Sequence, residues 1–237
     1  MDMKISGCGT VTSGEYDKVS LSGSTKVKGQ INCKEFSCSG SASGDADITC
    51  AGRVKASGST HVKSITADAV TATGSLKIDG NCSVKGKFAV SGSTSMGGKL
   101  KASLIESSGS LRVDNDIEGE ELHSSGTLNC KGLINAERID IKFDHGMTIG
   151  SIGGSTISIH PHIISFIPII ALFSDKLGTV TIENSIEGDE VSIEDVNAQS
   201  VTGRIVTIGK RCNIKLVQYS ERIDIDPDAA VEKVEKI

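Results

Sequence analysis

The sequence contains no tryptophan, and aromatic residues make up only 3% of its 237 positions. This scarcity is unusual for a carbohydrate-binding groove or a large globular core, because both draw much of their contact area from aromatic side chains. Proline is also rare, with 3 residues against 27 glycines. Collagen and disordered low-complexity chains combine abundant glycine with abundant proline, so neither class fits.

Several chemical signals are missing as well. The formal net charge is −5 and the basic residues form no stripe, which argues against a nucleic-acid partner. No glycine phrase ends in Gly-Lys-Ser/Thr, so we expect no nucleotide site. The start of the sequence shows no basic stretch, apolar run and small-residue cleavage site in succession. We therefore expect no secretory signal and a cytoplasmic protein, with membrane association left open.

The seven cysteines show neither CxxC-type spacing nor an even total, so they predict neither a zinc site nor a disulfide framework. Cys33 and Cys50 stand at equivalent places in the repeat described next, and Cys82 and Cys130 occupy apolar positions of it. Small apolar side chains fill a narrow interior well, and free cysteine behaves as one. We interpret these residues as core packing.

The chain is rich in a Ser/Thr-Gly pair that returns eight times at intervals of 16 to 18 residues. A fixed short period of this kind predicts a solenoid, in which each repeat is one structural unit stacked on the previous one. The glycines of the eight pairs are Gly7, Gly23, Gly40, Gly58, Gly74, Gly92, Gly109 and Gly126.

An apolar residue stands four places before each of these glycines. Within each repeat apolar and polar residues alternate with period two, which indicates strands. About 17 residues divided into three strands and three corners make one coil of a parallel β-helix, in which like residues stack at about 4.8 Å. The fold class is therefore all-β, a parallel β-solenoid. From the second repeat onward, the predicted core ladder is Val19, Phe36, Val54, Val70, Phe88, Ile105 and Leu122.

The repeat weakens after Gly126 and resumes from Leu177, where the phrase at 186–191 echoes that at 117–122. We therefore expect a first β-helix block at 1–155, an apolar insert or loop at 156–176, and a second, shorter block at 177–237. The last seven residues have apolar side chains at every third position. We expect them to cap the open end as a short helix or strand.

The insert contains eleven consecutive uncharged residues, too few for the roughly 20 that cross a bilayer. Three interpretations stay open: it folds back over an apolar face, it docks on a membrane or a protein partner, or it is disordered. His160 and His162 nearby have no carboxylate or cysteine beside them and do not predict a metal. The candidate contact residues are Ile163, Ile164, Phe166, Ile167, Ile169, Ile170, Leu172 and Phe173.

The Ser-Gly-Ser coil beginnings and the Val-x-Gly-x-Ile strands and corners resemble those of the bactofilins, the bacterial polymer-forming cytoskeletal proteins. The phrase Ile186-Glu-Gly-Asp-Glu-Val191, with Ile208-Gly209 and Asp226-Pro227 after it, is similar to the longer, two-block members of that family. The resemblance covers most of the chain. It implies a right-handed, three-faced β-helix that joins other copies end to end in filaments and acts as a scaffold, often at the membrane.

Self-association is also expected on physical grounds, because the end of a β-helix is a strand edge that can pair with another chain. An enzyme on a β-helix needs long loops or a cleft, whereas here the corners are short and the five histidines share no column. We predict a non-enzymatic structural scaffold with itself as partner and no cofactor, metal or small-molecule substrate. The alternative is a monomeric or dimeric adaptor that docks a membrane or protein partner through 163–173.

Overall fold

The structure is a computed structural model that describes residues 1–162 and 178–237. It is an all-β chain whose strands form a parallel β-solenoid with about 17 residues per turn, which confirms the predicted fold class. The chain divides into two compact units, residues 1–120 and 121–237. The boundary falls within strand β16 (Ile117–Ser124).

The first unit is built from short strands separated by tight corners. Its strands before β16 are β1 (Met3–Ile5), β2 (Gly9–Val11), β3 (Gly14–Leu21), β4 (Ser24–Val27), β5 (Gln30–Cys38), β6 (Ser41–Gly44), β7 (Asp47–Ala56), β8 (Ser59–Val62), β9 (Ser64–Ala72), β10 (Ser75–Ile78), β11 (Cys82–Val84), β12 (Lys87–Val90), β13 (Ser93–Met96), β14 (Leu100–Ser107) and β15 (Ser110–Val113).

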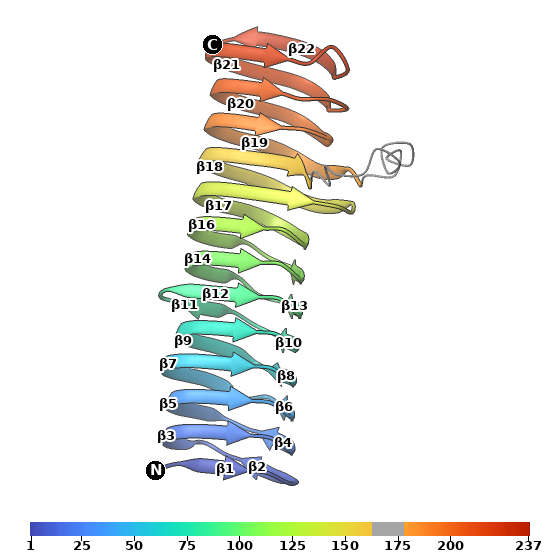
Figure 1. Cartoon of the computed structure of the whole chain (residues 1–237). Helices are drawn as coiled ribbons and strands as arrows, with labels where there is room; N and C mark the ends of the chain where they lie inside the picture. Colours follow the sequence, from blue (N-terminus) through green and yellow to red (C-terminus); the bar gives the residue numbers. More distant parts are fainter. Residues whose placement is uncertain (163–177) are drawn as a thin grey trace. The chain divides into compact units, whose positions relative to one another are not determined.

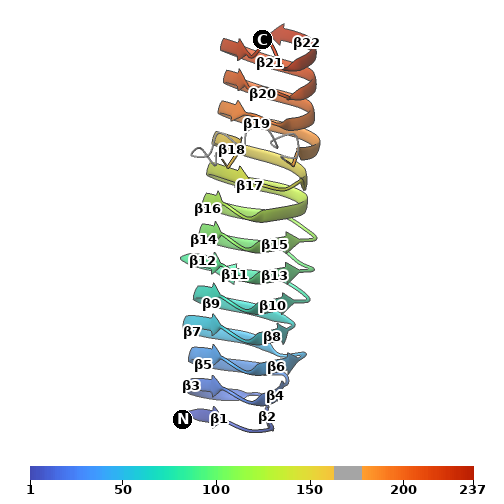
Figure 2. The ribbon, with the colours of Figure 1, turned by 45° about the vertical axis from the view of Figure 1, so that its right-hand side comes forward.

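One coil of this unit consists of three strands, which β10, β11 and β12 show most plainly. Each pairs in parallel with strands one coil earlier and one coil later; β10, for example, lies between β8 and β13. In other coils two of the strands join into a longer one, such as β5, whose register to β7 shifts at the corner between Cys33 and Phe36. Strands β3, β5, β7 and β9 therefore lie one above the next (Figures 1 and 2).

The predicted core ladder is buried throughout. Its six members in the first unit are direct register partners from one coil to the next, so each apolar side chain packs on its equivalents above and below. Leu122 of the second unit is 1% exposed. Burying one such aliphatic side chain contributes about 1.5–3 kcal/mol, so the column is a large part of the unit's stability.

The recurring glycines are explained by a close approach between coils. A Cβ atom on Gly74 would come well inside 3.0 Å of the carbonyl oxygen of Gly58 in the preceding coil. The backbone there runs close because Ser75 N–H donates to that same oxygen at 2.9 Å. The same clash recurs at Gly23, Gly40, Gly58, Gly92 and Gly109. At Gly7, in the first coil, nothing lies within 4 Å.

The second unit follows the same plan with longer strands, each covering most of a coil. The register between β19 and β20 shifts once, between Ile182 and Ser185, and that between β20 and β21 shifts once, between Gly203 and Ile205. In Figure 1 the ribbons of β19, β20 and β21 repeat the same path one above another. The strands after β16 are β17 (Thr127–Phe143), β18 (Met147–Pro161), β19 (Val180–Ile193), β20 (Val196–Ile208), β21 (Asn213–Ile225) and β22 (Ala230–Lys236).

The observed units differ from the division expected from the sequence. Residues 156–161, assigned to the insert, belong to strand β18, which pairs with β17 over Arg138–Phe143. Strands β18 and β19 are register partners on both sides of their shift, so residues before and after the expected insert form one continuous sheet in one unit. This continuity could not be predicted from the sequence, because the repeat weakens after Gly126. The expected C-terminal cap is strand β22, which pairs in parallel with β21.

Candidate assembly surfaces

The first coil of unit 1 leaves apolar ladder positions partly open. Strand β1 pairs with β3, which places Met3 beside Val19 and Ile5 beside Leu21. Val19 and Leu21 are 0% and 2% exposed, whereas Met3 and Ile5 are only half-buried. An unpaired strand edge with apolar side chains is a template for pairing with another chain.

A small ionic cluster holds this first coil in place. The carboxylate of Asp17 lies 2.5 Å from the N-terminal ammonium of Met1 and 2.6 Å from Lys34 Nζ in the next coil. The hydrogen bond from Lys34, and then that from the ammonium, lower the pKa of Asp17 to about 2. The carboxylate is therefore ionised over the neutral range and ties β1 to the two coils that follow.

The last coil of unit 2 is open in a similar way. Strand β22 pairs with β21, which sets Val234 beside Val217. Val217 is 0% exposed, whereas Val234 is 45% exposed. Ile223, the register partner of fully buried Val206, is half-buried. Lys233 and Glu235 on β22 form an ion pair at 2.5 Å, which lowers the pKa of Glu235.

An ion pair between a buried carboxylate and a half-exposed arginine fixes one corner of the second unit. Asp195 is 4% exposed and accepts two hydrogen bonds, from Arg211 Nε and Nη2, each at 2.5 Å. This pairing raises the pKa of Arg211. Both residues have positive φ, 56° and 54°, so successive coils turn here with the same backbone conformation. A positive φ costs free energy for residues other than glycine, and the ionic contact offsets part of that cost.

The lateral faces carry charges that pair between adjacent coils. Lysine and acidic residues one coil apart lie within ion-pair distance at several places. The pairs in unit 1 include Lys63–Asp47 at 3.0 Å, Lys85–Asp68 at 2.9 Å, Lys99–Asp116 at 2.7 Å and Lys101–Glu118 at 2.6 Å. Exposed pairs of this kind contribute little stability each, but they neutralise part of the charge on these faces.

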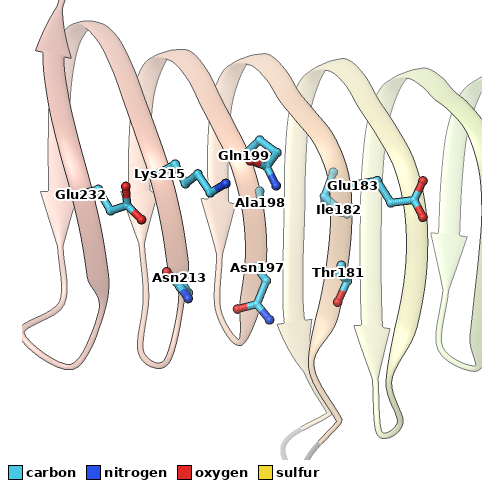
Figure 3. Close-up of a pocket in the computed structure, with 9 residues that line it drawn as sticks. All are labelled: Thr181, Ile182, Glu183, Asn197, Ala198, Gln199, Asn213, Lys215 and Glu232. Carbon is cyan, nitrogen blue, oxygen red and sulfur yellow. The ribbon is translucent and has the colours of Figure 1, made fainter.

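A shallow hollow of about 240 Å³ lies on one face of unit 2 (Figure 3). Thr181, Asn197 and Asn213 are register partners and form one row across it. Glu183 and Lys215 come from the neighbouring row, and the labelled side chains project from successive coils without converging on a point. General acid–base chemistry needs groups that converge on one reacting atom. The row instead offers hydrogen-bonding groups in a line.

The sequence analysis also named an apolar contact segment and two histidines beside it. The eight apolar contact residues between Ile163 and Phe173 lie outside the described residues. His160 Nε2 lies 3.2 Å from Ser192 Oγ, and the described residues hold no group of three or more metal-ligating side chains. Within residues 1–162 and 178–237 no helix has the length and apolar character that a membrane crossing requires.

The cysteines are buried, as expected from their columns, with the exception of Cys8, which is exposed. Burial raises the pKa of Cys82 to about 12, consistent with an inert thiol in an apolar interior. Cys33 and Cys50 differ, because they are direct partners in adjacent coils and line a second hollow. Sequence reasoning noted their shared column but missed their exposure to this hollow.

The fold and these surfaces define the chain as a parallel β-solenoid, an architecture compatible with a structural scaffold. Among curated proteins it is similar to the uncharacterized protein YhbF of Bacillus subtilis, at 31% identity over 107 residues, 45% of this chain and 42% of that protein. It is also similar to the uncharacterized protein YhbE of the same organism, at 30% identity over 106 residues, 45% and 44% respectively. The chain spans less than half the length of these relatives. No family model and no solved structure matches it.

Proposed function

We propose that the chain is a non-enzymatic structural scaffold of the bactofilin type, which assembles end to end through the terminal coils of its solenoid. The observation that carries this proposal is the loss of burial in the ladder columns at those coils. Met3 and Ile5 in the first coil are half-buried and Val234 in the last is exposed, whereas their equivalents one coil inward are buried.

A head-to-tail contact fits this chemistry best. Every strand pairing described in either unit is parallel, so a further coil added in the same sense repeats the hydrogen-bonding pattern already present. The contact would cover the outer edges of β22 and of β1 and β2, and would bury their half-exposed apolar side chains. Because such a contact joins two different surfaces and does not close on itself, it propagates into a filament.

The ion pairs on the lateral faces support the same conclusion. Several lysines and carboxylates are already paired between adjacent coils of one molecule, as at Lys63–Asp47 and Lys101–Glu118. Lateral association has little to gain from groups that are already paired. The terminal coils offer unpaired backbone groups and apolar area instead, so association there is favoured.

The test uses sedimentation velocity and negative-stain electron microscopy on the full chain at several concentrations. Val234→Asp places a charge on the outer edge of β22, where stacking would bury it at a cost of several kcal/mol. Leu133→Asp is the matched control, because Leu133 on β17 is also exposed, at 41%, but does not lie on a terminal strand. We expect Val234→Asp to shorten or abolish the oligomers and Leu133→Asp to leave them unchanged. Wild-type protein that stays monomeric at every concentration contradicts the proposal.

A further inference from the structure

Cys33 on β5 and Cys50 on β7 are direct register partners in adjacent coils of unit 1. The other buried cysteines of this unit face apolar neighbours: Cys82 pairs with Ile65 and Leu100. Adjacent parallel strands lie about 4.8 Å apart. That spacing falls within the range of about 4.4–6.8 Å between Cα atoms that a disulfide spans. The two thiols can therefore be joined without a large backbone movement.

Both thiols line a hollow of about 320 Å³ on the side of the solenoid. Cys33 is 6% exposed and Cys50 is 2% exposed, so each sulfur is sheltered yet borders the hollow. Asp68 and Lys85 stand at its rim and form an ion pair at 2.9 Å. The next residue in the same column is Ala67. An alanine fills the equivalent position in the next coil, so packing of the column does not require a cysteine.

The surroundings of the two sulfurs are unequal. The thiol of Cys33 and the backbone N–H groups of Gly52 and Phe36 donate toward the Cys50 sulfur, and together they lower the pKa of Cys50 to about 7. The register of the strands shifts beside both cysteines, between Cys33 and Phe36 and between Cys50 and Arg53. The hydrogen bond to Cys50, and then burial, raise the pKa of Cys33. Of the two thiols, Cys50 therefore has the lower pKa and ionises first. As a thiol, Cys50 donates a hydrogen bond to the backbone oxygen of Lys34 at 3.3 Å.

We propose that Cys33 and Cys50 form a redox-active dithiol that closes to a reversible disulfide under hydroperoxides. The Cys50 thiolate attacks one oxygen of hydrogen peroxide; the O–O bond breaks, and the departing hydroxide takes a proton to leave as water. The product is a sulfenic acid on Cys50. The Cys33 sulfur then attacks the Cys50 sulfur, the S–S bond forms, and the S–OH bond breaks to release a second water with the proton from Cys33.

The balance is complete: two thiols lose two electrons, and one hydroperoxide is reduced to two waters. A dithiol reductant reverses the reaction by exchange. The disulfide would link two successive coils of unit 1 through one closed loop, and so would strengthen the coil stack when oxidants are present.

The experiment treats the full chain with hydrogen peroxide, blocks the remaining thiols with N-ethylmaleimide, and maps the products by tandem mass spectrometry. We expect a cross-linked pair of peptides around Cys33 and Cys50 that lacks two hydrogens and disappears on treatment with dithiothreitol. Fragment spectra must separate Cys50 from Cys38, since one tryptic peptide carries both. Cys82 serves as the internal control and should remain reduced.

Variants separate the two roles. Cys33→Ala and Cys50→Ala each introduce alanine, the residue type already present in this column at Ala67. Both variants should therefore fold. Cys33→Ala removes the resolving thiol, so the sulfenic acid formed on Cys50 should persist and be trapped by dimedone. It should form more slowly than in the wild-type chain, because the hydrogen bond from Cys33 that most lowers the pKa of Cys50 is lost. Cys50→Ala should lose the reaction altogether. Alkylation of Cys50 by iodoacetamide should rise through half its maximum near pH 7. A Cys50 that reacts no faster than Cys82, or a peroxide-treated chain without the cross-link, overturns the proposal.

Discussion

Gly74→Ala probes the closest approach between coils in unit 1. The added methyl group would meet the carbonyl oxygen of Gly58 well inside 3.0 Å, a separation that real Cβ atoms essentially never show. The obstructing atom is backbone and cannot rotate away, so the two coils must move apart at this corner. The hydrogen bond from Ser75 N–H to the same oxygen, 2.9 Å in length, is lengthened or lost.

Three terms give the magnitude of the destabilisation. Forcing an extra methyl group into a packed site costs about 1–3 kcal/mol, and losing one backbone hydrogen bond costs about 0.5–1.5 kcal/mol. Replacing glycine lowers the entropy of the unfolded chain and returns about 0.4–1 kcal/mol. We expect a net destabilisation of about 1–4 kcal/mol. At about 2–4 °C per kcal/mol for a chain of this length, the melting temperature falls by several degrees.

Gly7→Ala is the matched control, because it changes the same repeat position in the first coil, where nothing lies within 4 Å of the new methyl group. Urea unfolding followed by circular dichroism measures both variants, and hydrogen exchange shows where any loss of protection occurs. Gly7→Ala should be neutral or slightly stabilising, and Gly74→Ala should lose protection at Ser75 and its neighbours. Equal stability of the two variants would refute the close-approach explanation.

Three further predictions follow from single contacts. Val70→Asp places an unpaired carboxylate in a fully buried column, costs several kcal/mol, and should unfold unit 1; unchanged circular dichroism and melting temperature would contradict this. Asp195→Ala leaves Arg211 without its buried partner and should cost about 1–3 kcal/mol in urea unfolding, because the arginine is half exposed and water compensates part of the loss. The lowered pKa of Asp17 means that its stabilisation is complete above about pH 4 and is lost as the pH falls toward 2. The β1 amides should lose protection from hydrogen exchange as the pH falls through this range. In Asp17→Asn their protection should not change over the same range.

The sequence predicted the fold well because a solenoid repeats one local solution. Residues such as Val70 and Phe88, which occupy equivalent places in the repeat, must stack on each other once the chain coils with a constant period, and they do. Periodicity also located the corner glycines. Their physical reason could not be read from the sequence, because it depends on how close the backbone of one coil lies to the next.

Other features were out of reach because they depend on neighbours that the repeat does not encode. The contact between Asp195 and Arg211 joins two irregular corners, and the role of each becomes visible only when both turn with positive φ. Cys33 and Cys50 could be assigned to one column, but the hollow beside them arises from residues of four coils. Residues 156–161, expected in the insert, belong to strand β18, because the strands continue where the repeat weakens in composition after Gly126.

The central claim is that the solenoid continues from one molecule into the next. Cryo-electron microscopy of the assembled full chain tests it most directly, by measuring the spacing of strands across the junction between subunits. The account predicts filaments in which the spacing of about 4.8 Å found within a solenoid continues unbroken from β22 of one copy to β1 and β2 of the next. Particles that remain single, or copies joined through their lateral faces with the terminal strands left free, would contradict it.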